Sequence, residues 1–165
     1  YAASIVAEVT VTGDQKVASS KGFRLLTGYI FGGNATRQKI AMTAPVIKIV
    51  PSEKIAMTAP VTLIAGQGDW RVRFTMPARY ALADLPVPNN TAVSIKSLPA
   101  ARFAVLRFSG LAGEAKVTAQ TARLMAFITA RGLTPLGPSP IARYNSPWTP
   151  WFLRRNEVML PVAGA

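Results

Sequence analysis

Two methionines, Met42 and Met57, occupy the same position in two identical octapeptides, Lys-Ile-Ala-Met-Thr-Ala-Pro-Val, at residues 39–46 and 54–61. Alternation of Ile, Met and Ala with Lys, Ala and Thr is typical of a β-strand with two different faces. Each copy ends near a proline, Pro45 or Pro60, which cannot donate to a sheet, so we expect two neighbouring antiparallel strands that bend there. Their flexible thioethers could contact an irregular apolar ligand, and the alternative is that both only fill the core.

A second group of candidate residues lies on the first predicted helix. Asp14 can cap a helix that runs to about Phe31, where Gly32-Gly33 ends it. A broad side is expected to face the core, and it carries Gly22, Leu25, Leu26, Tyr29 and Ile30. Another face follows a spacing of three and then four residues, and it carries Ser20, Phe23 and Thr27, with Lys16 one turn earlier. Phe23 could equally belong to the core, and Thr27 to ordinary helix surface.

The usual catalytic side chains are missing from this sequence. It contains no histidine and no cysteine, which removes the commonest bases, nucleophiles, thiolate metal ligands and disulfides. The seven acidic residues are well separated, and no phosphate loop or dinucleotide motif occurs. We therefore expect a protein that is not an enzyme, with chemistry on a bound cofactor left open.

Composition indicates one globular domain over residues 1–165. Half of the residues are hydrophobic, and no apolar stretch reaches the length of a membrane span. Because the first residue is Tyr1 rather than Met, we expect the chain to begin inside a longer or processed precursor. The sequence does not decide between a periplasmic, a membrane-anchored and a cytoplasmic location. The net charge of +12 favours anionic partners. The basic residues are scattered along the sequence, however, which is more typical of an ordinary solvated surface than of a nucleic-acid-binding face.

The remaining segments predict an internal repeat. Strands are expected at 4–12, 70–76, 92–98, 102–110, 141–144 and 158–162. A second helix is expected at about 112–131, with Val117, Thr121, Leu124 and Ile128 on one face at 4-3-4 spacing. Corresponding motifs of the two halves lie about 100 residues apart, so we interpret residues 1–76 and 91–162 as two β-α-β-β units. Two such units predict an α+β fold with a distorted antiparallel β-barrel, two helices and a ligand cleft between the halves.

Three motifs together resemble the SOUL haem-binding protein family. They are Phe31-Gly-Gly-Asn34, the Met-Thr-Ala-Pro-Val copies, and the segment Ala-Arg-Tyr-Asn-Ser-Pro-Trp-Thr-Pro-Trp-Phe-Leu-Arg-Arg-Asn-Glu-Val-Met-Leu-Pro at 142–161. The similarity runs from about residue 5 to residue 162. It implies a pseudo-twofold β-barrel with two helices, akin to gyrase-inhibitor-like ligand-binding domains. Its implied ligand is haem or a related tetrapyrrole, held in a shallow apolar cleft.

The resemblance also implies where the ligand would lie. The family's cleft face on the first helix matches Ser20, Phe23 and Thr27, so Lys16, Lys21 or Arg24 would have to meet the propionates. Histidine ligation of iron is impossible here, which leaves Met42, Met57, a tyrosine or a lysine as candidates, or no protein ligand at all. Arg71 and Arg73, on the polar face of the 70–76 strand, are expected to be solvated and to matter little.

Aromatic residues near the C-terminus form the other candidate surface. Trp148 and Trp151 could stack on a flat macrocycle, with Arg154 and Arg155 pairing its carboxylates. The alternative is a rigid loop that packs its tryptophans to close the barrel. Glu157, beside Arg154, is expected to form an internal ion pair rather than to act as an acid catalyst.

Three functions remain after these considerations. The first is non-covalent tetrapyrrole binding by a carrier, buffer or sensor. The second is a small-molecule-binding barrel for another flat hydrophobic anion. The third is a basic module that binds nucleic acid or, as a peripheral contact, an anionic membrane.

Overall fold

The fold was analysed in a computed structural model that describes residues 1–35, 53–57, 60–145 and 148–163. Met42 and the first octapeptide lie outside these residues, so the expectation of a strand there stays a prediction. The described elements are β1 (Ser4–Thr12), α1 (Gln15–Ile30), β2 (Asn34–Ala35), β3 (Val61–Ala65), β4 (Asp69–Thr75), β5 (Val87–Pro88), β6 (Ser94–Leu98), β7 (Phe103–Ser109), α2 (Glu114–Ala130), β8 (Ile141–Arg143), the short 3-10 helix η1 (Trp151–Leu153) and β9 (Arg155–Pro161). In this part of the chain, no helix is long and apolar enough to cross a bilayer.

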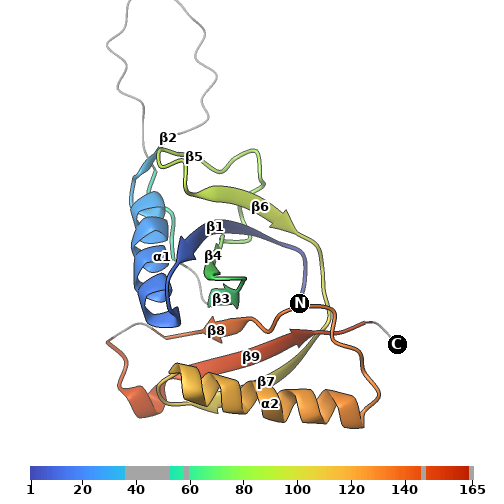
Figure 1. The fold of residues 1–165 in the computed structure, drawn as a ribbon. Coiled ribbons are helices and arrows are strands. Elements are labelled where there is room, and N and C mark those ends of the chain that lie inside the picture. Colours follow the sequence, from blue (N-terminus) through green and yellow to red (C-terminus); the bar gives the residue numbers. More distant parts are fainter. Residues whose placement is uncertain (36–52, 58–59, 146–147, 164–165) are drawn as a thin grey trace, which may run out of the picture.

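The main sheet has seven antiparallel strands in the order β6-β1-β4-β3-β8-β9-β7 (Figure 1). The first half of the chain supplies β1, β4 and β3, and the second half supplies β6, β8, β9 and β7. The halves meet in the middle of the sheet at β3 and β8, where three residue pairs join them, from Val61 with Arg143 to Leu63 with Ile141. They also meet at the edge, where β6 pairs with β1. β2 and β5 pair separately as a small second sheet.

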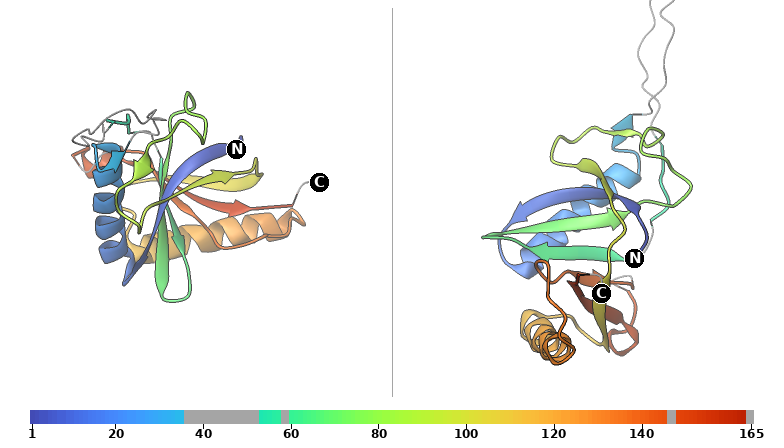
Figure 2. Two further views of the ribbon diagram at one scale, coloured as in Figure 1. Left: turned by 90° about the horizontal axis from the view of Figure 1, so that it is seen from above. Right: turned by 90° about the vertical axis from the view of Figure 1, so that its right-hand side faces the viewer.

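Each half packs one helix against its own strands. Helix α1 contacts β1 and β4, and α2 contacts β7 and β9, so the two helices cover different parts of the sheet (Figures 1 and 2). Alternating positions of β1 and β4 and the apolar sides of both helices meet in one core, as the periodicity predicts. Leu26 and Ile30 of α1 and Ile128 of α2 are fully buried in it.

Two local interactions fix the start and the position of α1. Its predicted cap is confirmed, since the side chain of Asp14 accepts a 2.8 Å hydrogen bond from the backbone nitrogen of Val17. Gly22 lies directly against β4, because a Cβ at this position would come within 2.5 Å of Cγ2 of Val72. The helix can therefore approach the sheet this closely only where it lacks a side chain.

Two expectations about the sheet are wrong. In the described residues the sheet is open rather than a barrel, because β6 and β7 lie at opposite ends of the strand order. The second octapeptide does not form a strand over 54–57, and regular pairing starts at Val61. Asn34 explains this difference: its side chain bonds both the amide and the carbonyl of Glu53 and ties the segment to the end of α1.

The sheet buries a charged cluster on β1. Glu8 accepts 2.6 Å hydrogen bonds from Nε of Arg73 on β4 and from Nζ of Lys96 on β6. Burial alone would raise the pKa of Glu8, but these two cations outweigh it and hold the pKa below its usual value. The expectation that Arg73 is solvated is therefore wrong, because its side chain is paired with Glu8 and only 17% exposed.

Candidate functional site

A cleft of about 920 Å³ lies between α1 and the second half of the chain. This volume is within the range of about 300–1,000 Å³ that is usual for small-molecule sites. One wall is α1, and the other consists of the turn before α2 and the segments around β8 and β9. The lining residues are Asp14, Gln15, Lys16, Ser19, Ser20, Phe23, Arg24, Thr27, Val61, 110–114, Arg143, Asn145 and 154–156. A separate open hollow of about 540 Å³ lies beside Tyr1 and residues 100–103, and no residue predicted for the site lines it.

The structure brings together five of the nine residues predicted for the site. The α1 residues that line the cleft are Lys16, Ser20, Phe23, Arg24 and Thr27. Lys21, on the same helix, is exposed but does not line it. Met57 and Trp148 also lie outside the cleft lining, and Met42 is outside the described residues.

Phe23 serves both the core and the cleft. Its ring meets that of Phe74 on β4 edge to face, with centroids 5.4 Å apart, and it still contributes to the cleft wall. Thr27 donates its hydroxyl hydrogen to the backbone carbonyl of Phe23, which leaves the methyl group as its apolar surface. This part of α1 can therefore offer a flat apolar ligand a rigid contact.

Arg143 is the cleft residue that sequence reasoning missed. Its Nη1 donates a 3.0 Å hydrogen bond to the hydroxyl of Ser19 on α1, and its Nη2 donates one of 3.1 Å to the carbonyl of Ala112. Among the described residues, its Nε is the one buried side-chain nitrogen or oxygen without a hydrogen-bond partner. Burial, and secondarily the charge of Arg154, lower the pKa of Arg143. A half-buried guanidinium without a carboxylate is suited to an anionic group.

The cleft as a whole is basic. Its lining includes five basic residues, Lys16, Arg24, Arg143, Arg154 and Arg155, and two acidic residues, Asp14 and Glu114. The carboxylate of Asp14 already caps α1, and Arg155 is paired with Glu157. Phe23, Val61 and Leu111 supply apolar surface between these charges. Such a lining favours a ligand that is both apolar and negatively charged.

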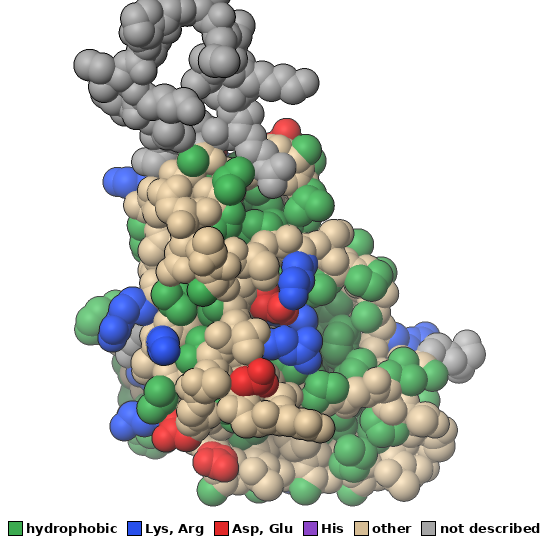
Figure 3. Space-filling model, turned by 45° about the horizontal axis from the view of Figure 1, so that its top comes forward, with side chains coloured by type: hydrophobic (Ala, Val, Ile, Leu, Met, Phe, Trp, Pro, Cys, Tyr) green, Lys and Arg blue, Asp and Glu red, His purple; other side chains and the backbone are tan. Residues whose placement is uncertain are grey.

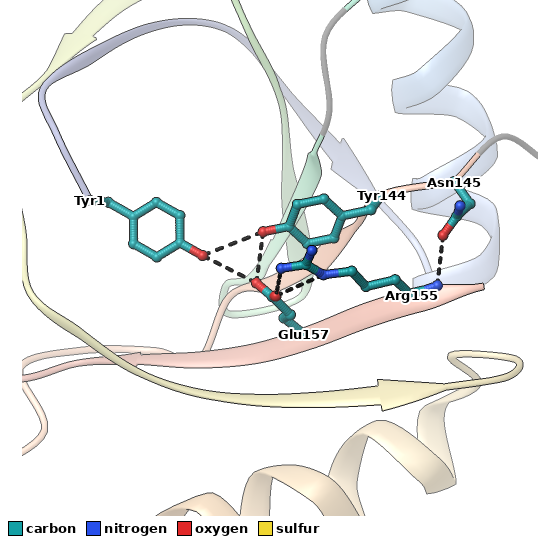
Figure 4. A network of polar contacts seen from close by, with 5 residues as sticks. All are labelled: Tyr1, Tyr144, Asn145, Arg155 and Glu157. Carbon is teal, nitrogen blue, oxygen red and sulfur yellow. Dashed lines mark hydrogen bonds and ion pairs between the residues drawn. The ribbon is translucent and has the colours of Figure 1, made fainter. Parts of the chain in front are cut away.

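A network around Glu157 holds the β9 side of the cleft. The buried carboxylate accepts hydrogen bonds from the hydroxyls of Tyr144 at 2.7 Å and Tyr1 at 3.1 Å, and from Nη2 of Arg155 at 2.5 Å (Figure 4). The ion pair predicted for Glu157 therefore exists, but its partner is Arg155 rather than the neighbouring Arg154. Burial opposes ionisation of Glu157, but these donors outweigh it and lower its pKa. Asn145 completes the network by accepting from the amide of Arg155 at 2.6 Å. Glu157 thus has a structural role.

Candidate iron ligands are sparse around the cleft. Among the described residues no methionine or tyrosine lines it, and Lys16 is its one lysine. Met57 is 47% exposed, so it neither fills the core nor faces the cleft. No group of three or more acidic, histidine or cysteine residues in the described chain is arranged to hold a metal ion. The residues present fit the carboxylates and the apolar ring of a tetrapyrrole better than they fit its metal.

The tryptophans do not close the sheet. Trp148 is 90% exposed, and Trp151 also projects into solvent. Neither lines the cleft, so neither of the two roles expected for them is found in the structure.

The family of the chain follows from comparison with known families. The sequence model of the SOUL heme-binding protein family matches residues 1–161 of the 165. The chain belongs to the SOUL family. Membership suggests haem or tetrapyrrole binding, and a search of curated proteins found no match to this SOUL chain.

Solved structures share the fold of this SOUL chain at low sequence identity. The C-terminal domain of EcmrR matches with a TM-score of 0.70 and 11% identity, over 100% of this chain and 94% of that one. A protein from Listeria innocua described as a hydrolase matches with a TM-score of 0.62 and 11% identity, over 98% and 88%. SAV2435 bound to tetraphenylphosphonium matches with a TM-score of 0.53 and 12% identity, over 99% and 91%. These likenesses establish the α+β fold.

Proposed function

We propose that this SOUL chain binds haem or a related tetrapyrrole non-covalently in the cleft between α1 and the second half, as a carrier, buffer or sensor. Phe23, Thr27, Val61 and Leu111 would contact the ring. Lys16, Arg24 and Arg143 would pair with its carboxylates, and no histidine would ligate the metal. Family membership supports this ligand class, and the lining of the cleft supports the binding mode.

One observation carries this proposal: the buried Nε of Arg143 has no partner in the described chain. Removing a charged donor from water without pairing it is costly, so such a group is kept where a ligand completes it. A carboxylate in the cleft beside this guanidinium would restore the electrostatic balance that burial and Arg154 disturb. Neutral ligands cannot provide this compensation.

The test compares two ligands on the unmodified protein. Protoporphyrin IX has two free carboxylates, and its dimethyl ester has the same ring without charge. A charge-assisted contact contributes about 1.5–3 kcal/mol, so we expect the diester to bind about 10- to 100-fold more weakly in a fluorescence titration. Equal affinity for the two would contradict the proposal. Hemin, titrated in parallel through its Soret band, shows whether the metal adds affinity.

The alternative function is binding of a different flat hydrophobic anion in the same cleft. The same basic and apolar lining favours it, and it predicts tight binding of a fused-ring carboxylate together with negligible binding of protoporphyrin IX. The tetraphenylphosphonium bound to SAV2435 is a lipophilic cation. Five basic residues in the lining of this cleft disfavour such a ligand.

We propose binding rather than catalysis or nucleic-acid recognition. The acids in the cleft wall are Asp14, which caps α1, and Glu114, and the chain has no histidine or cysteine. Basic side chains are spread over the face drawn in Figure 3 instead of forming one stripe, whereas nucleic-acid domains concentrate them. An affinity for duplex DNA that exceeds the affinity for protoporphyrin IX at physiological salt would reverse this preference.

We further infer that the two halves derive from one β-α-β-β unit. The inference is supported by their strand order, because β1-β4-β3 and β7-β9-β8 run inward from the two sides to the shared β3–β8 pair. In both sets the helix directly follows the outer strand, α1 after β1 and α2 after β7, and β6 precedes β7 as an additional strand. Superposition of the halves in an experimental structure should need a rotation of about 180°.

A further inference from the structure

An exposed apolar turn lies between β8 and β9. Trp148, Trp151, Phe152 and Leu153 are all more than half exposed, which is unusual for four large apolar side chains within six positions. We call these four residues the aromatic turn. Isolated exposed apolar residues need no explanation, but a contiguous group on one turn marks an interaction surface.

The aromatic turn is an ordered feature. The amide of Leu153 donates to the carbonyl of Pro150 at 3.0 Å, and Nε of Arg154 donates to the carbonyl of Thr149 at 2.8 Å. The rings of Trp151 and Phe152 meet edge to face with centroids 5.6 Å apart. These contacts fix the shape of the turn while its apolar side chains remain exposed.

Positive charge borders the aromatic turn. Arg154 and Arg155 follow it directly. Lys116 of α2 also lies near the turn, since a Cβ on Gly110 would be 2.9 Å from Nζ of Lys116 and 3.9 Å from Cε3 of Trp151. The nearest acid in sequence, Glu157, is buried and paired with Arg155. With a net charge of +12 on the whole chain, this side of the molecule is attracted to anionic surfaces.

We propose that the aromatic turn docks the protein peripherally on a bilayer that contains anionic phospholipids. Tryptophan and phenylalanine with adjacent arginine and lysine are the combination that favours the lipid–water interface, where rings enter the headgroup region and cations meet phosphates. Leu111, Arg154 and Arg155 line the cleft, so docking by the neighbouring turn brings the cleft mouth close to the membrane surface.

The test uses two kinds of vesicle, one of phosphatidylcholine alone and one of phosphatidylcholine and phosphatidylglycerol in equal parts. We expect co-sedimentation with the mixed vesicles, weakened by added salt, and little with phosphatidylcholine alone. The chain has three tryptophans, so in a Trp70→Phe background all tryptophan emission comes from Trp148 and Trp151. That emission should shift to shorter wavelength on the mixed vesicles.

A pair of variants separates docking by the turn from diffuse attraction. Trp148→Ser/Trp151→Ser should lose at least about tenfold in affinity for the mixed vesicles. Leu136→Ser is the matched control, because Leu136 is 64% exposed in another loop, and it should bind as the unmodified protein does. Circular dichroism verifies that each variant is folded. Equal binding by the double variant, or failure of the unmodified protein to bind the mixed vesicles, overturns the proposal. Self-association through the turn without lipid would identify a protein interface instead and would likewise overturn it.

Discussion

The guanidinium of Arg143 and the hydroxyl of Ser19 are joined by a 3.0 Å hydrogen bond, although 124 positions separate the two residues in the sequence. Ser19 belongs to α1 and Arg143 to β8, so this bond crosses between the two halves of the molecule. Together with the bond from Nη2 to the carbonyl of Ala112, it fixes the guanidinium at the wall of the cleft. In the proposed binding mode, ligand binding and the association of the halves therefore share one side chain.

Arg143→Met should test the ligand side of this shared role. Methionine keeps an apolar stem but removes the charge, so we expect protoporphyrin IX to bind about 10- to 100-fold more weakly. The dimethyl ester should bind the variant and the unmodified protein equally, since it has no carboxylate to lose. Equal losses for both ligands in a fluorescence titration would mean that Arg143 only supports the shape of the cleft.

Arg24 and Lys21 of α1 allow a controlled comparison of two basic residues. Both are exposed, but only Arg24 lines the cleft. Arg24→Ala should weaken protoporphyrin IX binding by about tenfold, near the lower limit for a charge-assisted contact, because the residue is solvated. Lys21→Ala changes the net charge by the same amount and should leave affinity unchanged. Equal effects of the two at fixed ionic strength would indicate long-range attraction without a defined site.

Gly22 and Gly28 predict opposite effects of the same substitution. Alanine at Gly22 would place a Cβ 2.5 Å from Val72, and overpacking of this kind costs about 1–3 kcal/mol. A Cβ on Gly28 would meet no described atom within 4 Å outside its own helix, so alanine should stabilise α1 by about 0.5–1 kcal/mol. Urea unfolding of both variants measures these changes. A stabilised Gly22→Ala variant would show that α1 does not approach β4 as described.

Arg73→Ala should destabilise the protein by about 1–3 kcal/mol, because it removes one of the two cations that compensate the buried carboxylate of Glu8. Lys96 remains as a partner and limits the loss. Glu8→Gln/Arg73→Ala removes the charge as well and should restore part of the stability. If Arg73→Ala unfolds at the same urea concentration as the unmodified protein, the ion pair between Arg73 and Glu8 contributes nothing to the free energy of unfolding.

The two buried carboxylates, Glu8 and Glu157, predict how the free energy of unfolding depends on pH. The pKa of Glu8 is lower in the folded chain than its ordinary value of 4.5, and the pKa of Glu157 is lowered too. The unfolded chain therefore binds protons more readily, and stability that is fully present above about pH 4.5 is lost as the pH falls through the folded-state values. Thermal unfolding from pH 7 to pH 3 should show this loss, and Arg73→Ala should reduce it.

Periodicity predicted both helices and most strands of this fold. Apolar residues recur along α1 and α2 at helical spacing and alternate along β1 and β4, and these patterns record burial directly. The second octapeptide also alternates, but Asn34 bonds Glu53 and holds the segment at the end of α1. A tertiary contact of one asparagine side chain thus overrides the local pattern, and the sequence carries no sign of it.

The α1 side of the cleft could be predicted, and the opposite side could not. Residues that share one helix face have a fixed spacing, so Lys16, Ser20, Phe23 and Thr27 were found together. Arg143 belongs to a strand whose place depends on pairing with β3, and although it stands in the 142–161 motif, its spacing from the α1 residues does not show that it faces them. Trp148 was expected to pack or to stack, but its ring is 90% exposed at the start of the aromatic turn.

The short β3–β8 pairing has a consequence for the order of folding. β1 with β4 and β7 with β9 pair over seven residues each inside one half, whereas β3 and β8 pair over three residues between segments far apart in the sequence. Closing the longer loop costs more chain entropy and gains fewer contacts, so we expect each half to acquire its own pairs first. Pulsed hydrogen exchange during refolding should then show late protection of those amides in residues 61–63 and 141–143 that donate across the β3–β8 pair, and earlier protection of those that donate to β4 or β9. Since the cleft exists only between the halves, a newly made chain would be able to hold its ligand only after this last step.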